Sequence, residues 1–471
     1  MPTKKIGRFS VWGVGGVSYE RNEGVTDSTD WSPNEITYTE RWADYMMATG
    51  VTHVFNPSIN SYLKSTIAMT KYGSATLLDT LLDEDVYENI IRKELFNTSL
   101  NLAISYNNKI SRRLTFRTGI NLNYSFYSYL LDISSAYTPK TNFLDSEGET
   151  FLSNVYTQFK FKLSEKMTIN AGLNFMYFDL NQYYSVEPRI GIQWELSKKQ
   201  SFGLGYGIHS RHELPVLYFK KYHDLGDDFS QLDLLRKLPT AHHFVASYAH
   251  RFNDNFYTKL EAYYQKIENY YVASQPEYTF SAADNYLDFS IPLTCDGLGQ
   301  NYGIEFTLEK YFTKNYYFLV TSSLFKSEYR AMNNIWYSTI YDLGYIHNIV
   351  AGKEFRIGEN KNDIFSTNVR FNWTGGKRDT PILLAESVEN GYTVYDELKR
   401  NQLQYPTYFR IDVGLSYQLY RKKTAHFLSV DIQNIINRKN IAHRYYNPSL
   451  KSLNIQTQAG MIPVFSYRLE F

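Results

Sequence analysis

Histidines are the residues of this sequence best suited to metal or acid–base chemistry. His209 and His212 are three residues apart, a spacing that brings two imidazoles onto one face of a helix. The surrounding residues instead predict a strand that runs into a loop, and no cysteine lies nearby to complete a ligand set. His242 and His243 would point to opposite faces of a strand, because successive side chains alternate. We therefore expect no metal site.

The other reactive groups lack the context of a catalytic site. Asp83, Glu84 and Asp85 lack the glycine and the terminal glutamate of a calcium-binding loop, which favours a solvated loop. Ser210 has no nucleophile-elbow sequence around it. Cys295 is the only cysteine, so neither an intrachain disulfide bond nor a cysteine metal cluster can form. We expect no catalytic residue, no enzymatic activity and no cofactor.

The composition is typical of a protein with much aromatic surface. The 471 residues carry a formal net charge of +1, which does not favour a nucleic-acid partner. Aromatic residues make up 17% of the chain, with 43 tyrosines and 30 phenylalanines. Mean hydropathy is −0.42 and no run of ~18 apolar residues occurs, which excludes a transmembrane helix. The absence of such a run does not exclude a transmembrane β-barrel, since only alternate residues of its strands face lipid. A barrel also needs aromatic girdles at both membrane interfaces, which would account for the high aromatic content.

Apolar and polar residues alternate over long segments. The pattern is clear in residues 114–124, 155–163, 167–175 and 409–419. Such segments of about ten residues match tilted strands that cross the hydrocarbon. A soluble β-sandwich also alternates, but its strands are usually about 5–6 residues long. The opposite face here stays polar or charged strand after strand, which suits a watery lumen.

Short and long connections also alternate along the chain. Short turns are predicted at 108–111, 164–166, 197–200, 253–255, 313–315, 358–362 and 421–424. Long loops are predicted at 20–43, 74–91, 128–149, 213–238, 272–298, 328–343, 377–404 and 438–459. Short periplasmic turns and long extracellular loops are typical of outer-membrane barrels. We predict an all-β fold, a large antiparallel transmembrane β-barrel of roughly 18 strands that occupies residues 1–471 as one domain.

The two ends of the sequence carry further information. Phe465, Tyr467, Leu469 and Phe471 alternate with polar residues up to the last position. This ending resembles the signal by which outer-membrane proteins are inserted by the barrel-assembly machinery; an ordinary edge strand is the alternative. The N-terminus has a basic start but no apolar segment or cleavage site of a signal peptide. We expect a fragment, or the distal part of an interrupted gene, of a protein located in the outer membrane.

A series of short motifs resembles one family in its order along the chain. The motifs are VEPRI at 186–190, GYGIHS at 205–210, EAYYQ at 261–265, NYGIEFTLE at 301–309, GKEF at 352–355, GGKRDTP at 375–381, FRID at 409–412, VDIQN at 430–434, NR at 437–438 and GMIPVFSY at 460–467. Together they resemble the barrel of TonB-dependent receptors that begin with a carboxypeptidase-regulatory-like domain. The resemblance implies about 22 strands around a plug. This chain would then lack the plug, the energy-coupling box and about four strands at its N-terminal side.

The resemblance implies uptake of a scarce ligand such as a siderophore, vitamin, peptide or glycan. Four aromatic residues are candidates for stacking on a planar or sugar ligand. They are Tyr345, His443, Tyr445 and Tyr446. The alternative is that these side chains belong to the outer aromatic girdle and to loop tips.

Basic residues predicted on the polar face form a second candidate set. Lys160, Lys162 and Arg410 could favour an anionic metal chelate. The alternative is pairing with neighbours such as Asp412, or with a plug.

Three functions remain open on this basis. The first is a receptor-type importer, whose partners are outer-membrane lipid and, only if a plug is supplied, the TonB energy-coupling complex. The second is a passive channel, since about 18 strands is also the size of a porin. The third is a remnant of a receptor gene that never inserts.

Overall fold

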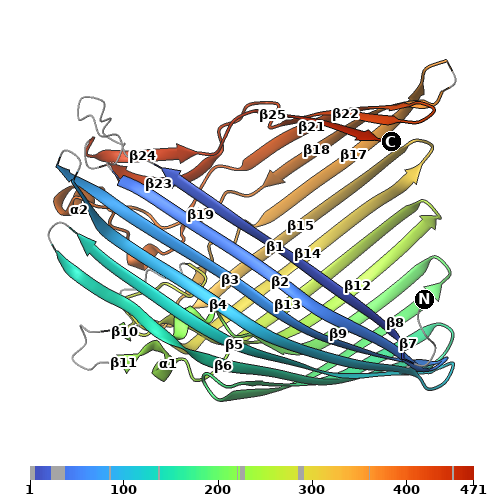
Figure 1. Cartoon of the computed structure of the whole chain (residues 1–471), viewed down its shortest axis with the longest axis horizontal. Helices are drawn as coiled ribbons and strands as arrows, with labels where there is room; N and C mark the ends of the chain where they lie inside the picture. Colours follow the sequence, from blue (N-terminus) through green and yellow to red (C-terminus); the bar gives the residue numbers. More distant parts are fainter. Residues whose placement is uncertain are drawn as a thin grey trace.

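The computed structural model describes residues 6–22, 38–83, 86–135, 138–219, 221–222, 229–284, 291–359, 361–447 and 450–471. Most of these residues form one antiparallel sheet of 19 strands. The strands lie side by side and are inclined to the long axis of the wall, so those of its two sides cross in the view of Figure 1. No helix in the described part of the chain is long and apolar enough to span a membrane.

The sheet is a meander in which each long strand pairs with the next. Without the three-residue β16 it has 18 strands, which confirms the number predicted from turns and loops. The long strands are β1 (Arg8–Asn22), β2 (Tyr38–Ser58), β3 (Ser61–Asp83), β4 (Val86–Lys109), β5 (Leu114–Ser135), β6 (Thr138–Lys162), β7 (Met167–Phe178), β8 (Tyr183–Ser197), β9 (Gln200–Ser210), β12 (Thr240–Asn253), β13 (Phe256–Ala273), β14 (Leu293–Thr313), β15 (Tyr316–Arg330), β17 (Tyr345–Ile357), β18 (Asp363–Thr374), β21 (Tyr408–Tyr420), β22 (Ala425–Gln433) and β25 (Ile462–Glu470).

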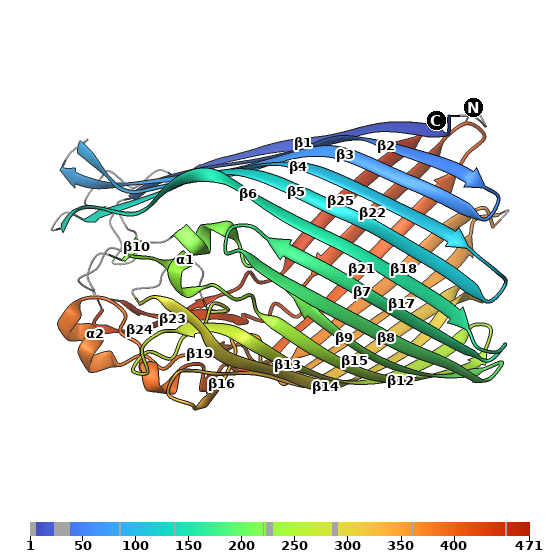
Figure 2. The same cartoon turned by 90° about the horizontal axis from the view of Figure 1, so that it is seen from below.

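All seven predicted short turns connect adjacent strands, and they lie at one end of the wall in Figures 1 and 2. In two of these turns a serine hydroxyl stabilises the turn. The Oγ atom of Ser111, and likewise that of Ser164, accepts hydrogen bonds from the backbone N–H groups two and three residues later. Two short connections were not predicted: the turn between Ser58 and Ser61 at this end, where the apolar Ile59 hides the break, and residues 179–182 between β7 and β8 at the other end.

Two of the predicted long loops are wrong. Residues 74–91 belong mainly to β3 and β4, and residues 128–149 mainly to β5 and β6. The strands continue in register far beyond the predicted ends, with Thr76 opposite Lys93 and Tyr129 opposite Ser146. Adjacent apolar residues such as Leu77-Leu78 and Leu130-Leu131 interrupt the alternation in these segments, whereas backbone pairing does not require alternation.

The remaining long connections fold into small elements at the other end of the wall. They are η2 (Pro215–Phe219), β10 (Lys221–Tyr222), β11 (Phe229–Ser230), α1 (Gln231–Leu234), β16 (Trp336–Ser338), β19 (Arg378–Asp379), α2 (Leu384–Asn390), η3 (Glu397–Lys399), β20 (Leu403–Gln404), β23 (Ile441–Asn447) and β24 (Ser452–Thr457). Figure 2 shows them together at the end opposite the short turns. The largest cluster of buried apolar side chains lies here, around Phe178, Leu217, Leu235 and Tyr271.

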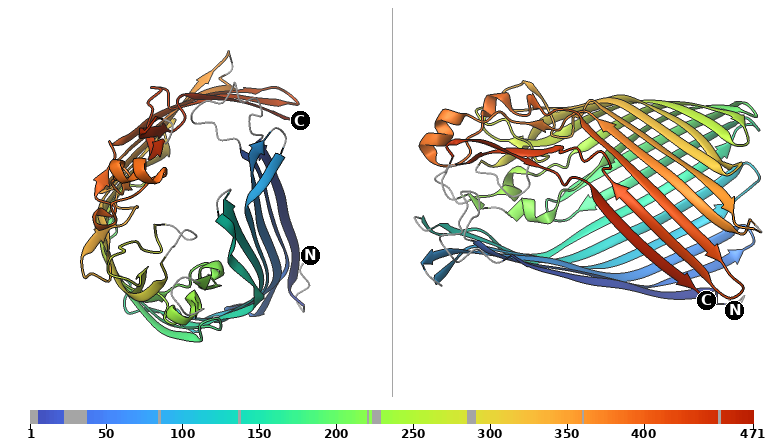
Figure 3. Two further views of the ribbon diagram at one scale, coloured as in Figure 1. Left: turned by 90° about the vertical axis from the view of Figure 1, so that its left-hand side faces the viewer. Right: turned by 90° about the horizontal axis from the view of Figure 1, so that it is seen from above.

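The two end strands of the sheet each lack a second neighbour in the described structure. β1 pairs only with β2, and β25 pairs only with β22. Every residue of both strands is exposed. Seen along its axis in Figure 3, the wall is a curved sheet whose first and last strands face one another across an opening. We call this opening between β1 and β25 the seam.

Candidate functional site

Strand register assigns one face of the wall to the interior. In β5 and β6, Asn121 pairs with Asn154 and lines an inner groove, whereas the neighbouring pair Ile120 and Val155 faces the other way. Val155, Phe159 and Phe161 lie on this same face of β6 and are 45%, 42% and 39% exposed, so they form an apolar stripe on the outside of the wall. The predicted separation into an apolar outer face and a polar inner face is therefore present in the structure.

Amide and hydroxyl side chains hydrogen-bond from strand to strand on the inner face. Asn123 donates to Asn101 at 2.7 Å, and Asn301 donates to Gln265 at 3.0 Å. Asn372 donates to Asn348 in the same way farther along the wall. These rows of cross-strand hydrogen bonds give the amide groups on the inner face partners within the wall itself.

A groove of about 850 Å³ lies on the inner face of β3 to β8. Its charged lining residues are Lys64, Arg117 and Arg189, and no carboxylate lines it. Arg189 contacts the buried Glu187 at 2.9 Å, whereas no ion pair is described for Lys64 or Arg117. Farther along the wall, Glu261 and Glu305 line a second pocket of about 510 Å³. Lys326 also lines this second pocket, so its lining carries both signs of charge, whereas the first groove is lined only by basic charged residues.

The predicted basic residues of the lumen divide into two groups. Arg410 donates to both carboxylate oxygens of Asp412, at 2.6 and 2.9 Å, so the pairing alternative is confirmed for this residue. Lys160 and Lys162 are exposed near the short-turn end of β6, and neither has an ion pair in the described structure.

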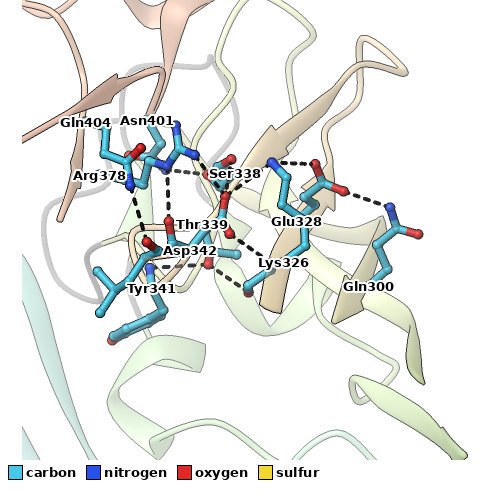
Figure 4. A network of polar contacts seen from close by, with 12 residues as sticks. Gln300, Lys326, Glu328, Ser338, Thr339, Tyr341, Asp342, Arg378, Asn401 and Gln404 are labelled. Atoms are coloured by element: carbon cyan, nitrogen blue, oxygen red, sulfur yellow. Dashed lines mark hydrogen bonds and ion pairs between the residues drawn. The ribbon is translucent and has the colours of Figure 1, made fainter. Parts of the chain in front are cut away.

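A buried carboxylate joins several segments at the loop end of the wall (Figure 4). Asp342 is fully buried and accepts from Ser338 Oγ at 2.7 Å and from the backbone N–H of Ser327 at 3.2 Å. Lys326 Nζ and Arg378 Nη2 each lie 3.3 Å from its Oδ2 atom. Two cations and two neutral donors therefore compensate one desolvated charge.

Asn401 extends this contact to a third loop. Its Nδ2 group donates to Asp284 Oδ1 and to the carbonyl oxygen of Ser338, both at 2.9 Å. We call the three connected segments, residues 273–284, 330–345 and 374–407, the outer loop assembly. Tyr329, near the end of β15, is buried and donates to the carbonyl oxygen of Thr279 at 2.7 Å. The three segments are thus connected to one another by hydrogen bonds and ion pairs.

A separate loop folds inward from between β9 and β12. Gln231 at the start of α1 is fully buried and makes two hydrogen bonds to the backbone of Leu293, at 2.6 and 2.7 Å. Tyr218 in η2 packs against Phe178, and burial raises the pKa of its hydroxyl to about 12. This loop narrows the interior at the level where the strands end, as the views in Figure 3 show.

Tyr345, the first candidate ligand-binding residue, lies on the outer face of β17. Its neighbours in the strand, Ile346 and Asn348, line an inner pocket, and Tyr345 alternates with them. Its ring stacks on His347 at 5.2 Å and meets Trp373 edge-on at 5.5 Å. This arrangement fits the alternative of an aromatic girdle.

The other three candidates lie on β23 in the loop region, and the structure separates them. His443 is exposed and lies 5.7 Å from the partly buried Tyr445 ring. Tyr446 is only 5% exposed, and its backbone N–H donates to Thr393 Oγ1. His443 and Tyr445 are accessible to a ligand, whereas Tyr446 packs within the loops.

The residues considered for metal or catalytic chemistry do not assemble into a site in the described part of the chain. His209, near the end of β9, lies edge-on to His243 with ring centroids 4.8 Å apart, and this is a pair without a third ligand. His212 lies in the following loop, and His242 contacts Tyr206 instead. No group of three metal-ligating side chains occurs in the described residues. Ser210 contacts Thr240 at 2.9 Å, and Cys295 lies 3.6 Å from the carbonyl oxygen of Leu234. Glu84 and Asp85 lie outside the described residues.

Sequence reasoning missed Asp342, Asn401 and Gln231. Each is a common polar residue in a segment that was predicted only as a loop. Most of the partners are distant in sequence, such as Ser327 at 15 positions from Asp342 and Asp284 at 117 positions from Asn401. No local pattern distinguishes a buried polar residue of this kind from a solvated one, although the Gly375-Gly376 pair marks the point where one loop passes close to others.

The fold matches solved receptor barrels over nearly the whole chain. The ferric-catecholate import receptor Fiu from E. coli matches with a TM-score of 0.66 and 9% identity, over 98% of this chain and 71% of that one. The ferric yersiniabactin uptake receptor FyuA from Yersinia pestis matches with 0.67 and 10%, over 98% and 68%. BauA, the ferric preacinetobactin receptor from Acinetobacter baumannii, matches with 0.62 and 12%, over 98% and 70%. Neither a protein-family model nor a curated protein matches the sequence.

Likeness at this level of identity establishes the fold. The all-β antiparallel wall, the number of strands and the alternation of short turns with long connections agree with the prediction. The matched proteins are named as receptors and transporters. The carboxypeptidase-regulatory-like domain implied by the motifs has no counterpart among these findings. The chain therefore has the barrel fold of TonB-dependent outer-membrane receptors.

Proposed function

We propose that this chain forms the barrel wall of an importer in the outer membrane of a Gram-negative cell. The observation that carries the proposal is the combination of an apolar outer face, a polar inner face and an interlocked outer loop assembly on one receptor-type fold. The wall separates lipid from an aqueous interior, and the loops offer a fixed outer surface for capturing a ligand.

The ligand class is proposed more narrowly from the matched receptors. Fiu, FyuA and BauA are named for ferric-catecholate, ferric yersiniabactin and ferric preacinetobactin. An iron chelate is therefore the first ligand class to test, ahead of a vitamin, peptide or glycan. The accessible His443 and Tyr445 are the proposed contacts in the loops, where aromatic rings can stack on a planar chelate.

Transport against a gradient requires a part that blocks the barrel and can be moved, in addition to the barrel wall. We propose that the intact importer also contains a plug, and that further β-strands fill the seam. The unpaired edges of β1 and β25 support the second part, since unsatisfied backbone groups in hydrocarbon cost several kcal/mol each. Coupling to the TonB complex would then operate through the plug, and insertion would use the barrel-assembly machinery acting on β25.

The intact mass of the native protein tests the proposal. An antibody against residues 377–404 would recover the protein from outer membranes for mass spectrometry. A mass well above 55.1 kDa, with additional N-terminal peptides, is the expected result. A product of 55.1 kDa that conducts ions in a planar bilayer would contradict the importer proposal and indicate a passive channel instead. Absence of any product from membranes of cells that transcribe the gene would identify a remnant.

A further inference from the structure

The groove on the inner face of β3 to β8 has a surplus of positive charge. Lys64, Arg117 and Arg189 line it, and its lining residues in the described part of the wall include no carboxylate. The buried Glu187 compensates only one of the three cations, because it pairs with Arg189. Lys64 and Arg117 are exposed, and no ion pair is described for either. Two positive charges therefore face the groove without a counter-charge among the described residues.

The carboxylate of Glu187 cannot serve a second cation. Its side chain is only 2% exposed, and it accepts from Arg189 Nη2 at 2.9 Å and from the backbone N–H of Ser210 at 2.9 Å. Asn174 Nδ2 and Ser185 Oγ each donate to it at 3.0 Å. Turning toward the groove would leave these donors unpaired. A guanidinium has five N–H donors, so Arg189 retains donors for a group in the groove.

The strand register holds the cations at fixed separations. Arg117 and Arg189 lie in one row of the sheet, which passes through Gln158 of β6 and Gly172 of β7. Three steps between strands place their Cα atoms about 14 Å apart, at ~4.8 Å per step. Gly172 contributes no side chain, so the groove is open between the two arginines. Both arginine side chains are long enough to reach a ligand that lies there.

The two uncompensated cations have neutral neighbours across the strands. The partners of Lys64 and Arg117 on the flanking strands are Val54, Ser105, Asn107 and Gln158. Four further amide side chains line the groove, those of Asn121, Asn154, Asn170 and Asn174. Amide and hydroxyl groups can donate to an anion, whereas a carboxylate would repel it. The second pocket, with Glu261 and Glu305 beside Lys326, has no such surplus of positive charge.

The size of the groove suits a small molecule with several acid groups. Its volume of about 850 Å³ lies in the range of ~300–1,000 Å³ that is usual for small-molecule sites. The cations come from three different strands, so separate acid groups of one ligand can each face a cation of their own. Hydrogen bonds between ionised partners are about twice as strong as neutral ones, which favours such a ligand over a neutral molecule.

We propose that this groove is a binding site on the inner wall for a small oligoanion, a molecule with two or more carboxylate or phosphate groups, held by Lys64, Arg117 and Arg189. The site is separate from the proposed loop contacts at His443 and Tyr445. It requires only that solutes enter the interior, which an importer and a passive channel have in common.

Isothermal titration calorimetry of the folded full chain in detergent tests the proposal. The probes are mellitate, which is a ring of carboxylates, inositol hexakisphosphate, which is a ring of phosphates, and the neutral myo-inositol. At low salt the wild-type chain should bind one of the two anions or both, and should not bind myo-inositol. Binding should weaken as salt is added, because the screening length falls from ~30 Å at 0.01 M to ~10 Å at 0.1 M. The anion that binds more tightly identifies the preferred acid group.

Single-charge variants locate the binding on the wall. Lys64→Gln and Arg117→Gln should each weaken binding about tenfold, the loss of one hydrogen bond between ionised partners. Lys71→Gln is the matched control and should bind like wild type. Lys71 is an odd number of residues from Lys64 in the same continuous stretch of β3, so this variant removes the same charge from the opposite face.

Three results would overturn the proposal. The first is failure of the wild-type chain to bind either anion. The second is equal affinity of the Lys64→Gln, Arg117→Gln and Lys71→Gln variants in their folded, heat-modifiable form, which would reduce binding to attraction by net charge. The third is tighter binding of a hexaglutamate peptide than of either ring, which would indicate a docking surface for an acidic protein segment. The mass measurement that tests the importer is independent of all three.

Discussion

Single residues decide whether the outer loops can pack together. A Cβ atom on Gly375 would lie 1.7 Å from the carbonyl oxygen of Leu343, and one on Gly376 would lie 1.6 Å from that of Tyr405. Neither glycine has a positive φ angle, so close backbone approach, rather than conformation, requires glycine here. The same loop supplies Arg378 to the buried Asp342.

Gly376→Ala is therefore expected to destabilise the outer loop assembly by about 1–3 kcal/mol, as overpacking does in a well-packed core. Limited proteolysis within residues 377–404 should become faster, with little change in the strands. Gly205→Ala is the matched control, because no heavy atom lies within 4 Å of the added Cβ. Equal protease resistance of the Gly376→Ala variant and wild type would contradict this account.

Asp342→Asn should loosen the same loops for a different reason. Removing the charge leaves Lys326 and Arg378 facing a neutral amide, at a cost on the order of 2 kcal/mol. Hydrogen exchange of residues 330–345 should increase relative to wild type. Asp254→Asn, in a short turn with no described partner, should have no such effect. Equal hydrogen-exchange rates of residues 330–345 in the two variants would show that Asp342 does not stabilise the outer loop assembly.

At the scale of elements, the strands follow from their local pattern and the long hairpins do not. β7 and β21 begin and end within a few residues of the predicted segments, because an alternating apolar face terminates where the membrane does. β5 and β6 continue past that point, where Tyr129, Leu131 and Leu144 are buried against Val216. In the last strand, β25, Phe465 and Tyr467 are 75% and 59% exposed.

Deletion of Phe471 tests the proposed role of this last strand in assembly. Folded, heat-modifiable barrel in the outer membrane should fall severalfold while the amount of synthesised chain stays constant, if the terminal aromatic residue is read during insertion. Phe471→Trp keeps an aromatic terminus and is the control, which should assemble like wild type. A deletion variant that assembles normally would leave β25 an ordinary edge strand.

At the scale of the whole molecule, the open question is how the sheet closes at the seam between β1 and β25. Each of the 17 successive pairings between long strands is antiparallel, so β1 and β25 run in opposite directions. An antiparallel barrel can then close either directly or through an even number of added strands. A long exposed edge is otherwise a site for aggregation.

Cross-linking distinguishes the two closures. In a Cys295→Ser background, a cysteine at Phe465 would be combined in turn with one at Phe9, Val11, Val17 or Tyr19 of β1. We expect no disulfide bond in the native membrane protein, because added strands keep the Cα atoms well beyond the ~7 Å limit for a disulfide. Cysteines at Leu428 and Tyr467, which are register partners, should form one readily. A bond across the seam would instead establish direct closure and favour a passive channel.

The sequence by itself determined the class of fold, the approximate number of strands, seven of the short turns and the polarity of each face. These features depend on side-chain alternation and on turn residues, which act over a few positions and can be read locally. Only the tertiary structure decided that Asp342 joins three loops, that Tyr446 is buried, that Tyr345 faces outward, and that β1 and β25 remain unpaired. Those outcomes depend on contacts between segments far apart in the chain, where an ordinary polar or aromatic residue carries no local sign of its partner.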